Sequence, residues 1–231
     1  AFVLAVIALH GLEGEGSATP PRADRVPFGT VLAEVWADRE ARRFTVFVFV
    51  SMLAYSAQDL ILEPFAGTVF GYTPGQSTSL SGVQHGGVLA GMIAVALAGS
   101  GRLRHRIGSL RAWTVGGCIA SAFALAALVA GAAIGPAWPL KATVFALGAA
   151  NGAFSIAAIG SMMRLAGQGR ERREGVRMGL WGAAQAVAFG FGGLVGTGAS
   201  DIAHRLLGDP SAAYATVFGL EALLFVAAAL L

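Results

Sequence analysis

Long apolar stretches separated by short polar connections dominate this chain. Each stretch is about 20 residues long, which is the length that an α-helix needs to cross ~30 Å of hydrocarbon. Complete spans are predicted at 44–63, 79–98, 112–134, 142–163, 178–199 and 212–231, and the apolar run 1–9 is interpreted as the end of a truncated helix. The predicted fold class is therefore all-α, a polytopic transmembrane helix bundle.

The connection 10–43 is polar and contains three prolines. We expect it to be a cytoplasmic loop. Within it, residues 31–43 alternate acids and arginines around Val35 and Trp36, a pattern that suits a short amphipathic helix at the membrane surface. The alternative is a solvated linker.

Basic residues are concentrated in three connections, at 10–43, 99–111 and 164–177. The exceptions among the 16 lysines and arginines are Lys141 and Arg205. Loops rich in arginine stay on the cytoplasmic side of a membrane, and the three loops alternate correctly with the predicted crossings. The sequence therefore predicts a multi-pass membrane protein, with these loops in the cytoplasm and lipid as its first partner.

The composition excludes most soluble alternatives. Of 231 residues, 55% are hydrophobic and 13% are charged, against roughly a quarter charged in an average soluble domain. The net charge of +3 does not indicate a nucleic-acid partner, because the basic residues lie in short blocks between apolar runs. Cys118 is the single cysteine, so neither a disulfide framework nor a thiolate site is expected. No free metal ion is expected.

Glycines spaced four apart predict close helix packing. In lipid, helices associate through small residues that let backbones approach one another. The pairs with this spacing are Gly82 and Gly86, Gly87 and Gly91, Gly148 and Gly152, and Gly192 and Gly196. The alternative is that glycine is simply common in membrane helices.

Ionisable and polar residues inside the spans are candidates for function, because such groups are costly in lipid. Asp59 and Glu63 lie one helical turn apart, with Tyr55 a turn earlier, and two such carboxylates repel unless a cation or a water-filled cleft relieves them. Pro64 is expected to end this helix, which would leave Glu63 merely solvated at the outer interface. Gln185 is a further polar candidate, although it and Asn151 also suit hydrogen bonds between helices.

The second complete span contains Gln84, His85, Gly86 and Gly87 in succession, with Gly82 one turn before. A neutral imidazole can ligate the magnesium of a chlorin, and adjacent glycines leave room for a flat macrocycle. The alternative is a histidine that bonds a neighbouring helix. The four histidines are far apart in sequence and no nucleophile motif is present, so an enzyme is not expected.

One connection resembles the cytoplasmic signature of the major facilitator superfamily, Gly-x-Leu-x-Asp-Arg-x-Gly-x-x-Arg/Lys. The matching residues are Gly101, Leu103, Arg106, Gly108 and Arg111. His105 stands where that family usually has aspartate. The resemblance implies that the spans form the second six-helix half of a major-facilitator-type fold, with 10–43 joining the two halves.

A sharper resemblance is carried by Gln-Asp-Leu-Ile-Leu-Glu-Pro-Phe-Ala-Gly at 58–67, Gln-His-Gly-Gly at 84–87 and Gly-Leu-Trp-Gly-Ala-Ala-Gln-Ala at 179–186. Together they resemble the bacteriochlorophyll-delivery (PucC/LhaA-like) family of phototrophic bacteria, over nearly all of 28–231. Membership implies a role in assembling light-harvesting antenna complexes in the photosynthetic, intracytoplasmic membrane. It also implies bacteriochlorophyll as the cofactor, with antenna polypeptides, photosynthetic complexes and pigment-synthesis enzymes as partners.

Two hypotheses therefore stand beside each other. The leading one is a non-enzymatic assembly factor that binds or delivers bacteriochlorophyll, with His85 as the magnesium ligand. The alternative is a proton-coupled secondary transporter of a small solute, with Asp59 as the proton carrier. A chlorin absorption spectrum of the purified protein distinguishes the two.

Overall fold

The computed structural model describes residues 28–99, 109–167 and 174–231, and every regular element in these ranges is a helix. The elements are α2 (Phe28–Ala37), α3 (Arg39–Phe70), α4 (Pro74–Gly99), α5 (Leu110–Ile134), the short 3-10 helix η2 (Gly135–Ala137), α6 (Leu140–Gly167), α7 (Glu174–Leu207) and α8 (Pro210–Leu230). Six of the described helices are long and apolar enough to cross a membrane. The predicted all-α, polytopic bundle is confirmed; the predicted remnant 1–9 lies outside the described residues.

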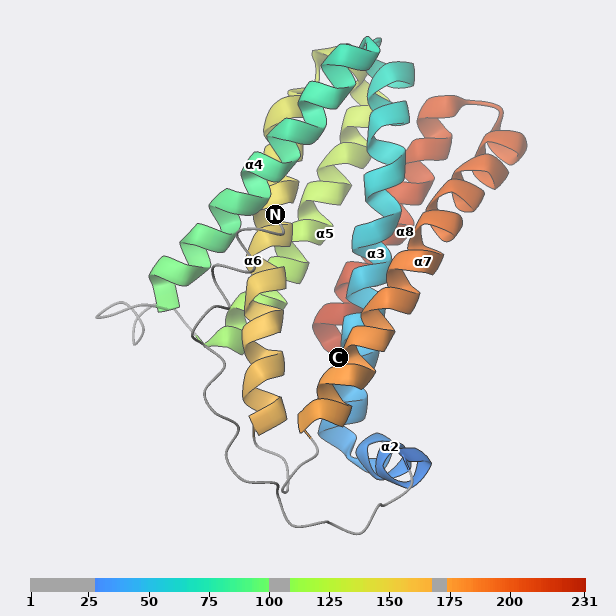
Figure 1. Ribbon diagram of the computed structural model, residues 1–231. Coiled ribbons are helices and arrows are strands. Elements are labelled where there is room, and N and C mark those ends of the chain that lie inside the picture. The colour runs from blue at the N-terminus through green and yellow to red at the C-terminus, as the bar shows by residue number, and fades with distance from the viewer. Residues whose placement is uncertain (1–27, 100–108, 168–173) are drawn as a thin grey trace, which may run out of the picture.

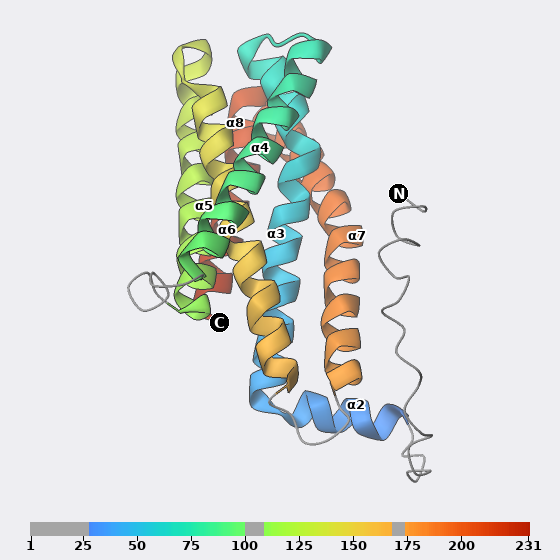
Figure 2. The same cartoon turned by 60° about the vertical axis from the view of Figure 1, so that its left-hand side comes forward.

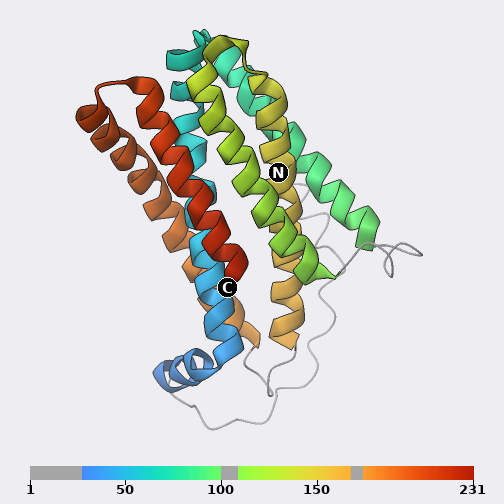
Figure 3. The same ribbon diagram turned by 180° about the vertical axis from the view of Figure 1, so that it is seen from behind.

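The long helices run up and down through one bundle (Figure 1). The connections from α3 to α4, α5 to α6 and α7 to α8 lie at one end, and α2 lies across the other (Figures 1 and 2). Helix α4 packs mainly on α6 and α7 mainly on α3, whereas α5 packs on both α6 and α8, as the view from behind shows (Figure 3). The apolar windows of α4 and α7 are only 28% and 17% buried, against 61% for α3. These two helices therefore present the open faces of the bundle.

Aromatic side chains fill the centre between α3, α6 and α8. Phe65 of α3 meets Phe218 of α8 at a centroid distance of 4.9 Å, and Phe154 of α6 meets Phe225 of α8 at 5.5 Å. All four rings are fully buried. Edge-to-face contacts of this kind add to the apolar packing that holds the three helices together.

The predicted amphipathic segment at 31–43 is divided between two helices. Helix α2 covers its first part and ends at Ala37, and α3 begins at Arg39. The break occurs at Asp38, whose carboxylate accepts hydrogen bonds from the backbone N–H groups of Glu40 and Ala41. Such a side chain satisfies amides that a new helix leaves without intrahelical partners, so Asp38 starts α3.

Helix α3 does not end at Pro64, as the sequence analysis expected, but continues to Phe70. A proline removes one backbone hydrogen bond, yet helices in membranes tolerate this because neighbouring groups satisfy the freed carbonyl. Phe65 and Ala66 after the proline are fully buried, and their packing holds the last turns in place. The prediction was therefore wrong, and Glu63 lies inside the helix together with Asp59. Gly71 ends α3 with a φ of 70°.

Glycine brings α4 and α6 into backbone contact. A Cβ added to Gly87 or Gly91 would lie 2.3 Å from the carbonyl oxygen of Phe145 or 2.0 Å from that of Ala149, both on α6. Gly148 and Gly152 on α6 face α4 at equally short range. These two predicted pairs are confirmed as packing positions, because no larger residue fits at the crossing.

The other two glycine pairs differ from each other. Gly192 and Gly196 of α7 pack closely on α3, as predicted, because an added Cβ would come within 3.0 Å of Ser56 or Ala57. In contrast, a Cβ at Gly82 or Gly86 would meet no atom within 4 Å. The prediction that this pair packs against another helix is wrong for the described part of the chain.

Candidate functional site

Polar side chains of α3 and α4 meet near the connection between these helices. Gln84 Nε2 donates to Asp59 Oδ1 at 3.0 Å, and Ser81 Oγ donates to Glu63 Oε1 at 2.7 Å. Both carboxylates therefore find their hydrogen-bond partners on α4. The structure thus brings together the carboxylate pair and the Gln-His-Gly-Gly sequence, which the sequence analysis had treated as separate candidates.

The ring of His85 has a defined orientation. Its Nδ1 lies 2.8 Å from the backbone oxygen of Ser81, one turn earlier on α4. A carbonyl oxygen only accepts hydrogen bonds, so Nδ1 must carry the proton in this contact. In the neutral ring, Nε2 then keeps its lone pair, and the side chain is exposed. The exposed ring therefore offers Nε2 as a possible metal ligand.

The surface around this nitrogen consists of glycines next to the histidine and of larger apolar side chains farther along the helix. Gly82 and Gly86 flank His85 and are exposed, with open space where a side chain would be. Leu89, Ile93 and Leu97 follow at four-residue steps and are 60%, 49% and 61% exposed. We call this surface the α4 outer face; it consists of Gly82, His85, Gly86, Leu89, Ile93 and Leu97. It offers one nitrogen ligand above an apolar strip.

Two of the predicted pigment-site residues lie on the opposite side of α4. Gln84 is 4% exposed and is used by Asp59, and Gly87 is buried in the crossing with α6. The helical repeat of 3.6 residues separates them from Gly82, His85 and Gly86. The five predicted residues therefore do not share one face of α4: Gly82, His85 and Gly86 lie on one side, and Gln84 and Gly87 lie on the other.

The remaining candidates are not part of this arrangement. Tyr55 is half-buried, with its ring near Phe154 and Phe189 at centroid distances of 6.5 and 6.0 Å. Gln185 is half-buried on α7 and makes no hydrogen bond within the part of the chain that the structure describes. Asn151 does bond between helices, because its Oδ1 accepts from Ser121 Oγ at 2.8 Å.

The loop signature lies almost wholly outside the described residues. Gly101, Leu103, Arg106 and Gly108 fall in the segment 100–108, of which the structure gives no description. Arg111 is the exception and lies in the first turn of α5. Ser109 caps that helix, since its hydroxyl accepts from the backbone N–H of Ala112 at 3.2 Å.

A buried carboxyl on α8 was missed by the sequence analysis. Glu221 is 2% exposed, and neither of its carboxylate oxygens has a hydrogen-bond partner among the described residues. Gln58 of α3 is fully buried and likewise has no partner for either side-chain polar atom in these ranges. The signal was present in the sequence, because Glu221 is the one acidic residue in the apolar run 212–231. Buried groups of this kind are costly and need an explanation.

Comparison with known proteins identifies relatives over the whole chain. The family model described as PUCC protein matches residues 1–231. A protein of Rhodobacter capsulatus named bacteriochlorophyll synthase 44.5 kDa chain is 52% identical over 236 residues, which cover 100% of this chain and 53% of that protein. The protein PucC of Cereibacter sphaeroides is 28% identical over 228 residues, with 96% of this chain and 48% of that protein covered.

The chain thus spans about half the length of the curated relatives it matches. No solved structure matches it, and placement in the second half of a major-facilitator fold stays a prediction. The helices agree with a multi-pass membrane protein, and the family match extends over every described helix. This chain belongs to the PucC protein family.

Proposed function

We propose that the protein assists the assembly of light-harvesting antenna complexes by holding a bacteriochlorophyll against the α4 outer face, with His85 as the magnesium ligand. The observation that carries the proposal is the bond between His85 Nδ1 and the Ser81 carbonyl, which leaves the lone pair of Nε2 unused on an exposed side chain. The name of the Rhodobacter capsulatus relative refers to bacteriochlorophyll synthase and so supports bacteriochlorophyll as the bound pigment. The Cereibacter sphaeroides relative bears the name PucC, which supports the role in antenna assembly that the family resemblance implies.

The residues of the α4 outer face fit a bacteriochlorophyll. A bound chlorin would need one ligand for its magnesium, a flat surface for its ring and an apolar surface for its tail. His85 offers the ligand, Gly82 and Gly86 have no side chains that would collide with a ring, and the exposed leucines and isoleucine below them are apolar. The bound pigment would supply a magnesium ion with an open coordination position, and the chain would supply the nitrogen that fills it.

The carboxylate contacts act as positioning interactions. Ser81 accepts from His85 through its carbonyl and donates to Glu63 through its hydroxyl. The bond between Gln84 and Asp59 fixes the same turn of α4 against α3. Groups that orient a metal-ligating histidine keep its lone pair in one direction, which favours ligand binding.

In this proposal the pigment is held and handed on without being converted. Its partners are antenna polypeptides, photosynthetic complexes and pigment-synthesis enzymes, and its location is the photosynthetic inner membrane. The Rhodobacter capsulatus relative bears the name of a bacteriochlorophyll synthase chain, which supports pigment-synthesis enzymes as partners. Formation of bacteriochlorophyll from its precursor by the purified protein alone would contradict the non-enzymatic role.

The test uses the full-length protein in phototrophic cells. We expect the purified protein to show chlorin absorption bands, and His85→Leu to lose about nine-tenths of them while the protein still inserts into the membrane. His204→Leu is the matched control, because His204 Nδ1 makes the same contact with a carbonyl, that of Ser200 at 2.7 Å, on α7. The ring of His204 packs on Tyr214 at a centroid distance of 4.9 Å.

Two outcomes oppose the proposal. A colourless wild-type protein from cells with normal antenna would show that no pigment is held. Equal pigment and antenna levels in His85→Leu and wild type would assign His85 to a structural role on α4.

A further inference from the structure

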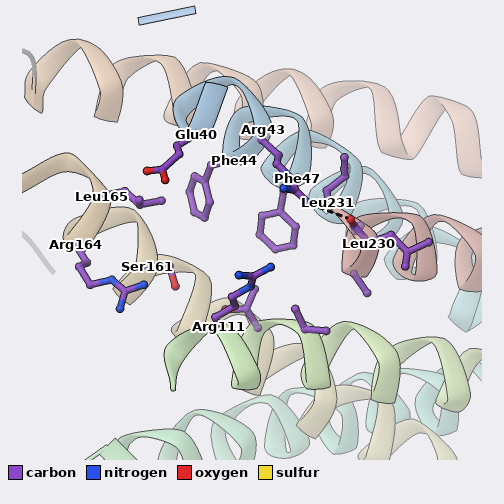
Figure 4. Close-up of a pocket in the computed structure, with 14 residues that line it drawn as sticks. Glu40, Arg43, Phe44, Phe47, Arg111, Ser161, Arg164, Leu165, Leu230 and Leu231 are labelled. Carbon is purple, nitrogen blue, oxygen red and sulfur yellow. Dashed lines mark hydrogen bonds between the residues drawn. The ribbon is translucent and has the colours of Figure 1, made fainter. Parts of the chain in front are cut away.

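A cavity opens at the end of the bundle opposite the bonds between α3 and α4. Its volume is about 360 Å³, and it lies where the first turns of α3 and α5 meet the last turns of α6 and α8. Arg43 of α3, Arg111 of α5 and Arg164 of α6 reach it from three different helices (Figure 4). The cavity thus collects arginines that are far apart in the sequence.

The described lining carries an excess of positive charge. Glu40 is the one carboxylate side chain among the described lining residues, against three guanidinium groups. Arg43 donates to the backbone oxygen of Leu230 at 3.4 Å. Arg111 and Arg164 form no hydrogen bond or ion pair within the described ranges, so their donors are available to a bound anion.

The cavity also has an apolar wall. Figure 4 shows the rings of Phe44 and Phe47 across the cavity from Arg111 and Arg164, with Ser161 between the two arginines. Arginine presents a planar set of donors that matches the oxygens of a phosphate group, and a serine hydroxyl can add a further hydrogen bond. The wall suits the first carbons of an acyl chain. The combination favours an anionic amphiphile.

The position in the bundle indicates the source of that anion. The arginine distribution predicts this end to be cytoplasmic, at the depth of the lipid headgroups. Basic pockets between membrane helices on that side attract anionic headgroups, because the leaflet carries a negative surface potential. A soluble phosphate compound would offer the same oxygens without the apolar chain.

We propose that this cavity binds the phosphate group of an anionic phospholipid from the cytoplasmic leaflet. Arg111 and Arg164 hold the phosphate oxygens, Ser161 donates a hydrogen bond, and the acyl chain lies against Phe44 and Phe47. The site shares no residue with the α4 outer face. A lipid bound there would connect α3, α5 and α6 at the end of the bundle where no described turn joins these helices.

The test measures lipid binding to the purified full-length protein by native mass spectrometry. The probes are phosphatidylglycerol, phosphatidylcholine with the same acyl chains, and inorganic phosphate. We expect phosphatidylglycerol to bind at least about tenfold more tightly than phosphatidylcholine, and the Arg111→Gln/Arg164→Gln variant to lose that difference. The matched control is Arg39→Gln/Arg42→Gln, which removes the same amount of charge at the same end of the bundle, from the start of α3 and outside the cavity lining. It should change binding by no more than about twofold.

Each other outcome decides against a stated part of the proposal. Equal binding of the two lipids, or equal loss in both double variants, overturns the site. Binding of inorganic phosphate that depends on Arg111 and Arg164, without binding of phosphatidylglycerol, overturns the lipid as the source. If the double variant does not fold, Arg164→Lys keeps the charge and loses the planar donors; unchanged affinity in that variant opposes the proposed contact.

Discussion

The two faces of α4 use the same residue type for opposite purposes. On the inner face, Gly87 and Gly91 touch the backbone of α6 so closely that even a methyl group would collide. On the outer face, Gly82 and Gly86 have open space around them, with His85 beside them. Both pairs have the same spacing in the sequence.

This difference shows that helix packing explains the inner pair of glycines but not the outer pair. Glycine inside a helix costs about 1 kcal/mol relative to alanine, so its presence needs a compensating gain. Close approach to α6 supplies that gain on the inner face. On the outer face, no described contact compensates for the cost of the glycines, whereas a pigment ring bound at His85 would. Substitutions on the two faces should therefore differ in their effect on the free energy of unfolding.

The largest effect is expected at the inner face. Gly91→Ala places a Cβ 2.0 Å from the carbonyl oxygen of Ala149, so the two backbones must separate. We expect the free energy of unfolding to fall by about 3 kcal/mol, measured by detergent-induced unfolding in mixed micelles. Gly86→Ala is the matched control on the same helix. A loss below about 0.5 kcal/mol at Gly91 would mean that the helices do not cross here as described.

A change of opposite sign is expected at Glu221. Replacement by leucine removes a buried carboxyl that has no hydrogen-bond partner among the described residues, next to Phe218 and Phe225. We expect the free energy of unfolding to rise by about 2 kcal/mol. Glu221→Gln, which keeps the shape and polarity, should not show this gain. A loss of stability in Glu221→Leu would reveal a partner for the carboxyl in the full-length protein.

A smaller loss is expected at Gln84, which lies on the buried side of α4 with Gly87. Gln84→Leu removes the donor that bonds Asp59 and leaves the carboxylate without it. Hydrogen bonds between membrane helices contribute about 1 kcal/mol, so the same unfolding assay should detect a loss of that size. Asp59→Asn keeps an acceptor for Gln84 and should cost less. Equal losses in both variants would show that the hydrogen bond from Gln84 needs a charged acceptor at position 59.

The smallest stability effect is expected at the outer face. Gly86→Leu adds a side chain into open space, so the free energy of unfolding should change by less than about 0.5 kcal/mol. Pigment that co-purifies should nevertheless fall severalfold, because the added side chain occupies the surface beside His85. Absorption spectra of equal amounts of protein measure this. Pigment retained at the wild-type level would place the ring elsewhere.

The sequence was sufficient to predict the spans and the family. The six long helices follow from apolar runs of a length that only lipid explains, and the residues of the family resemblance led to the family that the comparisons show. His85, Gly82 and Gly86 were predicted as candidates from the sequence. Their separation from Gln84 and Gly87 was not, since neighbours in sequence were assumed to share a surface.

Tertiary structure alone decided which side of each helix faces a neighbour. In a soluble helix an apolar stripe marks the buried side, but lipid is as apolar as a protein core, so the sequence of a membrane helix carries little of this signal. Packing therefore determined that Phe65 carries α3 past Pro64, that Glu221 is buried, and that Arg111 and Arg164 line one cavity. Helix length is a local property of the chain, whereas these contacts depend on segments that meet only when the bundle forms.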